Sequence, residues 1–175
     1  MSGSMSSGES WLAGTGTDSR RSSRRSHFEY QESPSEELSE GATTLMLRGL
    51  VRSINLDSFL RLLRNISQGY DLVYLPMGTR RSSNLGLAFV NYEDHASARR
   101  AFTALQQAVG PHTFRMVKTA FVQGLGPNLA FVLASADTSP VKHNSMAIFQ
   151  ARQRVKDPIA LMDQYVDQAM LEEAR

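Results

Sequence analysis

The stretch LGLAFVNY, at Leu85–Tyr92, decides the fold that this sequence predicts. Its residues alternate with a period of two, which is typical of a strand with one buried face. Gly86 and Ala88 make one side of the stretch small, and Phe89 projects from the opposite side. An earlier run, Leu45–Leu50 (LMLRGL), alternates in the same way. We therefore expect the two runs to be strands of one sheet.

Further strands and helices are predicted around these two runs. We expect strands at 43–48, 70–75, 85–92 and 116–120. Asn55 and Asp94 can each cap a helix, because apolar residues recur at helical spacing after both of them. The order strand–helix–strand–strand–helix–strand predicts an α+β fold of the split βαβ, or ferredoxin-like, type. Its four-stranded antiparallel sheet carries both helices on one face and leaves the other face available.

The composition divides the chain into three parts. Residues 1–42 are rich in serine, arginine and glutamate and have few large apolar side chains, so we expect a disordered tail. Residues 43–136 form the predicted domain, which ends in a short helix after the fourth strand. Residues 137–175 are predicted to be a linker and a C-terminal helical extension, with helices at 146–155 and 157–173.

Positive charge is concentrated in the predicted domain. The whole chain carries a net charge of +2, whereas residues 43–136 contain ten basic and four acidic residues. An excess of this size attracts phosphate backbones. The alternative is that it is ordinary solubility charge.

The chain lacks the residue patterns that catalysis and cofactor binding require. With no cysteine, disulfide bonds and thiolate metal sites are excluded, and the four histidines have no metal-ligating spacing. A nucleophile elbow, a phosphate-binding loop and a paired-carboxylate constellation are all missing. No apolar run approaches the roughly 20 residues that a membrane span needs. We therefore expect neither an enzyme, nor a cofactor, nor a membrane partner.

Four segments carry a resemblance to a known family. They are Thr43–Leu50 (TTLMLRGL), Tyr70–Pro76 (YDLVYLP), Asn84–Tyr92 (NLGLAFVNY) and Ala120–Gly124 (AFVQG). The strand pair resembles the two central strands of an RNA-recognition motif, and the four segments together resemble the C-terminal RNA-recognition motif of the Mei-two-like family of meiosis regulators. The likeness covers about residues 43–136. It implies a single-stranded RNA-binding protein of the nucleus or cytoplasm that acts in post-transcriptional regulation of meiosis or differentiation.

The resemblance also indicates which residues would contact RNA. A general RNA-recognition motif stacks bases at the positions of Met46, Leu87 and Phe89, of which only Phe89 is aromatic here. The family usually has an asparagine at the position of Gly49 and an aromatic residue at that of Leu87. Since each stacked base contributes roughly 1–3 kcal/mol, other residues must compensate. The candidates are the outward-facing Tyr74 and a cationic frame of Arg48, Arg80, Arg81, Arg115 and Lys118.

The alternative function is a protein-interaction module on the same fold. Met46, Leu87, Phe89 and Tyr74 would then form an apolar patch that the helix after the fourth strand, or a tail helix, covers. The C-terminal helices would dock a protein partner or a second copy of the chain. The exposure of Phe89 separates the two hypotheses, because only an accessible ring can stack on a base.

Overall fold

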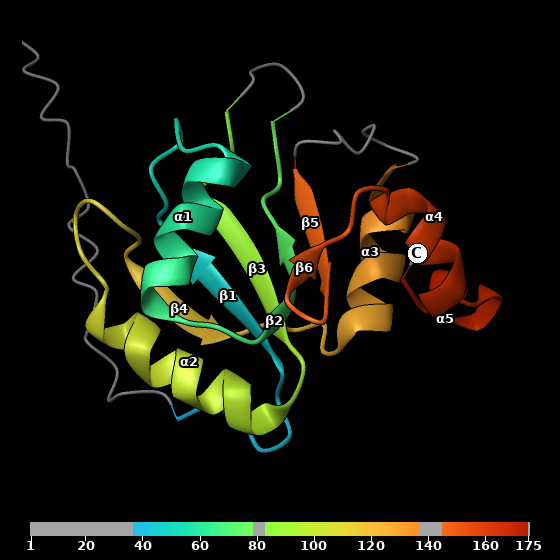
Figure 1. The fold of residues 1–175 in the computed structure, drawn as a ribbon, viewed down its shortest axis with the longest axis horizontal. Helices are drawn as coiled ribbons and strands as arrows, with labels where there is room; N and C mark the ends of the chain where they lie inside the picture. The colour runs from blue at the N-terminus through green and yellow to red at the C-terminus, as the bar shows by residue number, and fades with distance from the viewer. Residues whose placement is uncertain (1–36, 79–82, 137–144, 175) are drawn as a thin grey trace, which may run out of the picture. The chain divides into compact units, whose positions relative to one another are not determined.

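The computed structural model describes residues 37–78, 83–136 and 145–174 of the chain. These residues form a mixed α+β structure with a six-stranded antiparallel sheet in the order β4-β1-β3-β2-β5-β6 (Figure 1). Along the chain the elements are β1 (Thr44–Arg48), α1 (Leu56–Ile66), β2 (Tyr70–Tyr74), β3 (Leu87–Tyr92), α2 (His95–Gln107), β4 (Met116–Thr119), α3 (Leu125–Ala136), β5 (Met146–Gln150), β6 (Gln153–Arg154), α4 (Pro158–Tyr165) and α5 (Gln168–Glu173).

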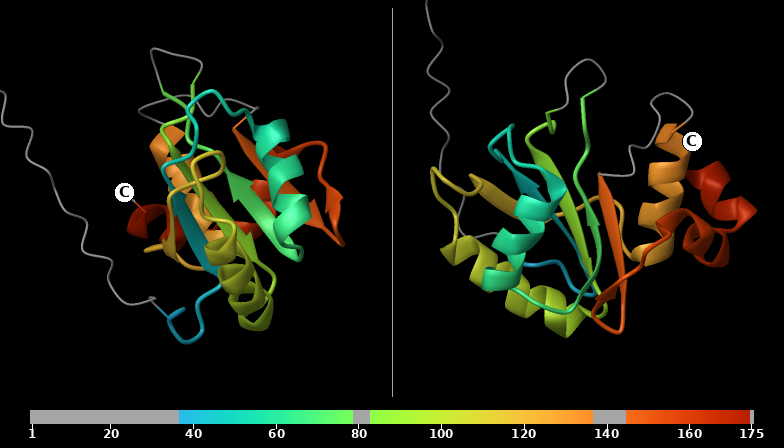
Figure 2. Two further views of the ribbon diagram at one scale, coloured as in Figure 1. Left: turned by 90° about the vertical axis from the view of Figure 1, so that its left-hand side faces the viewer. Right: turned by 45° about the horizontal axis from the view of Figure 1, so that its top comes forward.

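Two capped helices, α1 and α2, cover one face of the sheet (Figure 2). The side chain of Asn55 accepts a hydrogen bond from the backbone N–H of Ser58 at 2.9 Å, and that of Asp94 accepts one from Ser97 at 2.7 Å. Each bond satisfies one of the free donors at a helix start. Both capping predictions are confirmed.

The alternation predicted for the two main strands is also confirmed. On one face, Leu45 and Leu47 of β1 and Ala88 and Val90 of β3 are fully buried in a first hydrophobic cluster with α1 and α2. The side chains between them project from the opposite face, which we call the outer face. That face carries Met46, Arg48, Leu87 and Phe89. Leu38 also packs against the first cluster, although the sequence assigned residues 37–42 to the tail.

The prediction of a helix over 146–155 is wrong, because this segment forms β5 and β6. Residues 146–149 are all buried, and β5 pairs with the edge of β2, which the prediction had left open. A strand buried on both faces is apolar at every position, so its periodicity does not distinguish it from a buried helix. The sheet therefore has six strands where the sequence predicted four. Ala151 and Arg152, both with positive φ, make the two-residue turn into β6.

Helices α3 and α4 pack on the outer face, and α5 packs against α3. The helix predicted at 157–173 is two helices, α4 and α5, and Asp167 caps the second by accepting a hydrogen bond from the backbone N–H of Met170 at 2.8 Å. A second hydrophobic cluster joins α3 and α4 to β2 and β5. Its buried members are Leu72, Leu129, Val132, Met146, Ile148, Leu161 and Met162. In the left view of Figure 2, α3 lies on the side of the central strands away from α1 and α2.

Candidate nucleic-acid interface

The strand register lines up four side chains across the outer face. Met46 of β1 lies opposite Lys118 of β4 and Phe89 of β3, and Phe89 lies opposite Tyr74 of β2. Directly opposite residues project from the same face, with Cβ atoms roughly 5 Å apart. All four side chains are half-buried. This set, Lys118, Met46, Phe89 and Tyr74, is the central row, and it combines a cation with three apolar or aromatic side chains.

A cationic edge runs beside the central row. Arg48 is exposed and lies opposite Leu87 and Met116. Arg115, also exposed, donates its backbone N–H to the carbonyl of Arg48 at 2.8 Å. A Cβ atom at Gly49 would lie 2.8 Å from both Cβ and Cγ of Arg115, so the stem of this arginine occupies the space above the glycine. Glycine at position 49 thus makes room for the side chain of Arg115.

Tyr74 holds Phe89 in place. The two rings stack with centroids 6.2 Å apart and planes inclined by 21°. Burial raises the pKa of the Tyr74 hydroxyl above its usual value, so this ring stays neutral at physiological pH. Tyr74 also packs against the second hydrophobic cluster. Phe89 is therefore positioned by a ring that the C-terminal helices support.

The outer face is half covered. Under α3 and α4, Leu72 and Ile148 are fully buried and Met146 nearly so. Over β4, β1 and β3, the side chains of Met46, Leu87 and Phe89 remain half-buried. The two sequence hypotheses were a covered and an open sheet face. In the structure one part of the outer face is covered and the other is open, and Tyr74 lies at the boundary between them.

A buried polar network fastens the start of α3 to the sheet. The hydroxyl of Thr44 donates to Asn91 Oδ1 at 2.7 Å, and it accepts hydrogen bonds from Asn128 Nδ2 at 3.0 Å and from the backbone N–H of Gly124 at 3.1 Å. Gln123 Oε1 accepts from the backbone N–H groups of Thr43 and Thr44, both at 2.8 Å. Thr44 is completely buried, so each of these bonds replaces one that water would otherwise make.

The same network extends to β2 through an aspartate. Asn91 Nδ2 donates to Asp71 Oδ1 at 2.8 Å. Burial raises the pKa of the Asp71 carboxyl, and this hydrogen bond opposes the increase. Sequence reasoning missed the network, although its members Thr43, Thr44, Gln123 and Gly124 lie in segments that were compared with a known family. In the structure, these residues hold α3 to the sheet.

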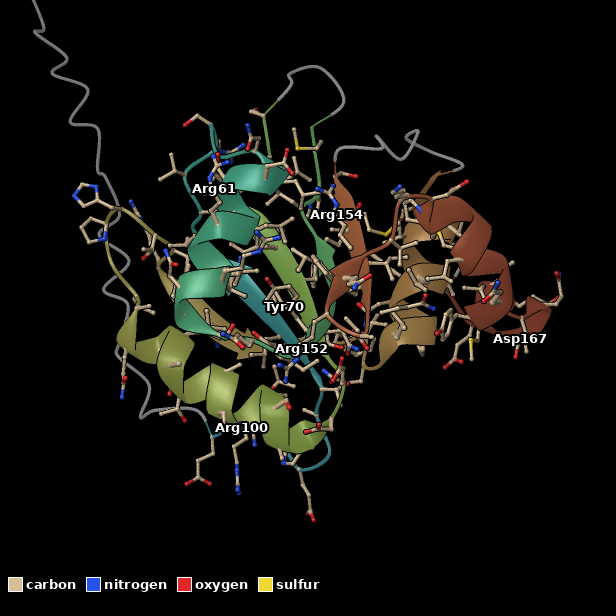
Figure 3. All side chains as sticks on the ribbon, in the orientation of Figure 1. Arg61, Tyr70, Arg100, Arg152, Arg154 and Asp167 are labelled. Atoms are coloured by element: carbon tan, nitrogen blue, oxygen red, sulfur yellow. The ribbon has the colours of Figure 1, made fainter. Side chains whose placement is uncertain are left out.

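The predicted site residues fall into three groups. Six of them share the open part of the outer face, namely Met46, Arg48, Tyr74, Leu87, Phe89 and Lys118, and Arg115 lies at its edge. Arg80 and Arg81 lie outside the described residues. Sequence reasoning missed Met116, which extends the row of Arg48 and Leu87. Figure 3 shows Arg61 and Arg100 on α1 and α2, the helices that cover the other face.

Metal-binding clusters and membrane-spanning helices are absent from the described parts of the chain. Within them, no group of three or more histidine, cysteine or acidic side chains is arranged to hold a metal ion. None of the helices described is both long and apolar enough to cross a membrane. No protein-family model matches this chain, and no curated protein matches it.

Proposed function

We propose that this protein binds single-stranded RNA on the open part of its outer face. The observation that carries the proposal is the central row, in which Phe89 lies in register between Met46 and Tyr74, with Lys118 at one end and Arg48 alongside. An accessible ring flanked by cations is the arrangement on which an unstacked base and its phosphate bind together.

The order of the elements supports an RNA-recognition motif as the scaffold. From β1 to β4 the chain runs strand–helix–strand–strand–helix–strand, and the four strands lie in the order β4-β1-β3-β2. This order matches that of a ferredoxin-like fold, which supports the proposed scaffold, and β5, β6 and the helices α3 to α5 would be additions to it. The four sequence segments that resemble the Mei-two-like family favour a relationship to it. Such a relationship implies a role in post-transcriptional regulation of meiosis or differentiation in the nucleus or cytoplasm.

Each residue of the interface has a distinct role in this proposal. Phe89 stacks on one base, and Met46 and Leu87 give apolar contact to its neighbours. Arg48 and Lys118 pair with phosphates or base edges. Because α3 and α4 cover the β2–β5 side, the open surface accommodates about two or three bases. Binding of so few bases should be of modest affinity.

Fluorescence anisotropy with a labelled mixed-sequence RNA octamer at low salt tests the proposal. Phe89→Ala should weaken binding roughly 5- to 150-fold, the equivalent of one stacked base. Arg48→Ala should lower the slope of log affinity against log salt by about one, as expected for one lost phosphate contact. Arg61→Ala is the matched control, since it removes the same charge from α1 on the covered face. The proposal fails if the octamer does not bind, or if Phe89→Ala and Arg61→Ala bind it equally.

A further inference from the structure

A hollow of about 400 Å³ lies between the segment that follows β4 and the helices α3 and α5. It is separate from the residues of the central row. Its apolar lining includes Phe121, Pro127, Phe131 and Met170. Phe121 is 102% exposed and Phe131 is 41% exposed, so both rings are available to a ligand. Large aromatic side chains exposed together in a hollow mark an interaction site more often than a chance feature of the surface.

One carboxylate is the free polar group of this hollow. Gln123 also lines it, but its amide is used, since its oxygen accepts from Thr43 and Thr44 and its nitrogen donates to the carbonyl groups of Thr44 and Ala120. Glu173 lines the hollow as well, is exposed, and has no hydrogen bond or ion pair with any residue that the structure describes. A ligand that enters the hollow therefore meets two phenyl rings and an available anion.

The surroundings of the hollow are acidic. Residues 167–174, which include α5, contain three acidic residues and no lysine or arginine. One of these, Asp167, caps α5, on which it is labelled in Figure 3. Negative charge of this density repels the phosphates of RNA and attracts a cationic ligand. The hollow thus differs in charge from the interface around Arg48 and Lys118.

We propose that this hollow docks a basic segment of a partner protein by binding one of its arginine side chains. A guanidinium group is planar and weakly hydrated, so it can lie against the ring of Phe121 while it donates two parallel hydrogen bonds to Glu173. The apolar neighbours of that arginine contact Phe131 and Met170. The inference does not rest on RNA binding by the outer face.

Close packing of α4 and α5 against α3 shapes the wall of the hollow. A Cβ atom at Gly126 would lie 3.0 Å from the carbonyl oxygen of Tyr165, at the end of α4, and 3.3 Å from Met170 Sδ of α5, so both helices approach α3 at this glycine. A larger residue must push the end of α4 and the start of α5 away from α3. Gly126→Val therefore alters the shape of the hollow without replacing any side chain that lines it.

The test uses the full chain and the tripeptide amide acetyl-Leu-Arg-Leu, with citrulline in place of arginine as the uncharged control. Two-dimensional ¹H–¹⁵N spectra should show shifts at residues 121–123, 131 and 170–174 with the arginine peptide. Glu173→Gln should weaken binding about two- to fivefold, and Phe121→Leu by a similar factor. Glu172→Gln, which removes a neighbouring charge outside the hollow, should leave binding close to that of the wild type.

Several results would overturn the inference. Equal binding of the citrulline peptide would exclude recognition of the guanidinium group. Wild-type affinity in both Glu173→Gln and Phe121→Leu, or shifts confined to other residues, would exclude the hollow. Shifts of the same residues by the RNA octamer, at concentrations below those of the peptide, would assign the hollow to nucleic acid. Because Phe89→Ala leaves the hollow intact, failure of the RNA proposal would be seen separately.

Discussion

Replacement of Thr44 by valine should loosen the attachment of α3 to the sheet. Valine has nearly the shape of threonine, so the substitution removes the hydroxyl without leaving a large cavity. Two hydrogen-bond partners of the lost hydroxyl keep another partner. Asn91 Oδ1 still accepts from Thr43 Oγ1 at 2.9 Å, and Asn128 Nδ2 still donates to the carbonyl of Gly124 at 2.7 Å. The backbone N–H of Gly124 loses the acceptor that it has at 3.1 Å.

The expected loss of stability follows from that one donor. A buried donor without an acceptor costs about 1–3 kcal/mol. For a compact unit of this size, the midpoint of thermal unfolding should fall by about 3–10 °C. Urea unfolding followed by circular dichroism measures the free energy of unfolding, and hydrogen exchange should show the largest loss of protection in α3.

Thr103→Val is the matched control for this experiment. The hydroxyl of Thr103 is exposed on α2 and donates to the carbonyl of Arg99 at 3.3 Å. Water can bond to the carbonyl of Arg99 in place of the hydroxyl, so removal of the hydroxyl should change the free energy of unfolding by less than about 0.5 kcal/mol. If Thr44→Val is as stable as Thr103→Val, or if exchange in α3 is unchanged, the network does not hold the helix as we argue.

Three further predictions concern single positions. Gly49→Asn should destabilise the fold by about 1–3 kcal/mol, measured as the free energy of unfolding, because φ is +75° there and the new Cβ would collide with Arg115; unchanged stability would refute the role given to the glycine. Leu87→Tyr should strengthen RNA binding at least about fivefold in the anisotropy assay, because it adds one stacking ring beside Phe89; unchanged affinity would argue against base stacking on this face. The hydrogen bond from the backbone N–H of Ser97 lowers the pKa of Asp94 in the folded state. The ionised carboxylate therefore stabilises the fold fully above the unfolded-state pKa of 3.8, and this stabilisation is lost as the pH falls through the lower folded-state pKa. Asp94→Asn keeps the cap and should flatten this part of the acid-unfolding curve; an unchanged curve would assign the slope to other groups.

Local sequence patterns predicted the part of the fold that local physics determines. Strands with one buried face alternate visibly, which is why β1 and β3 and the orientation of Phe89 followed from sequence. Caps such as Asn55 mark helix starts for the same reason, since the capping bond spans only three residues. The pairing of β5 with β2 joins residues more than 70 positions apart, and no local pattern encodes it.

The sequence predicted which residues share the candidate site, but not how much of the sheet face is open. Face assignments from alternation brought Met46, Phe89 and Lys118 together correctly, because strand register preserves the face of each residue. The half-covered outer face was not predictable, since it depends on where α3 packs. That position is determined by side chains such as Asn128, whose partner Thr44 is 84 residues away.

The sheet separates two hydrophobic clusters that have no residue in common. Energetic effects at sites without shared neighbours usually add. The effects of substitutions beneath α1 and α2 should therefore add to those of substitutions beneath α3 and α4, except on β2 and β5, whose alternate residues belong to one cluster or the other. The outer helical layer could therefore vary in sequence, and with it the surface that it presents, provided that Tyr74 and the hydrogen bonds of Thr44 are kept, because these still join that layer to the central strands.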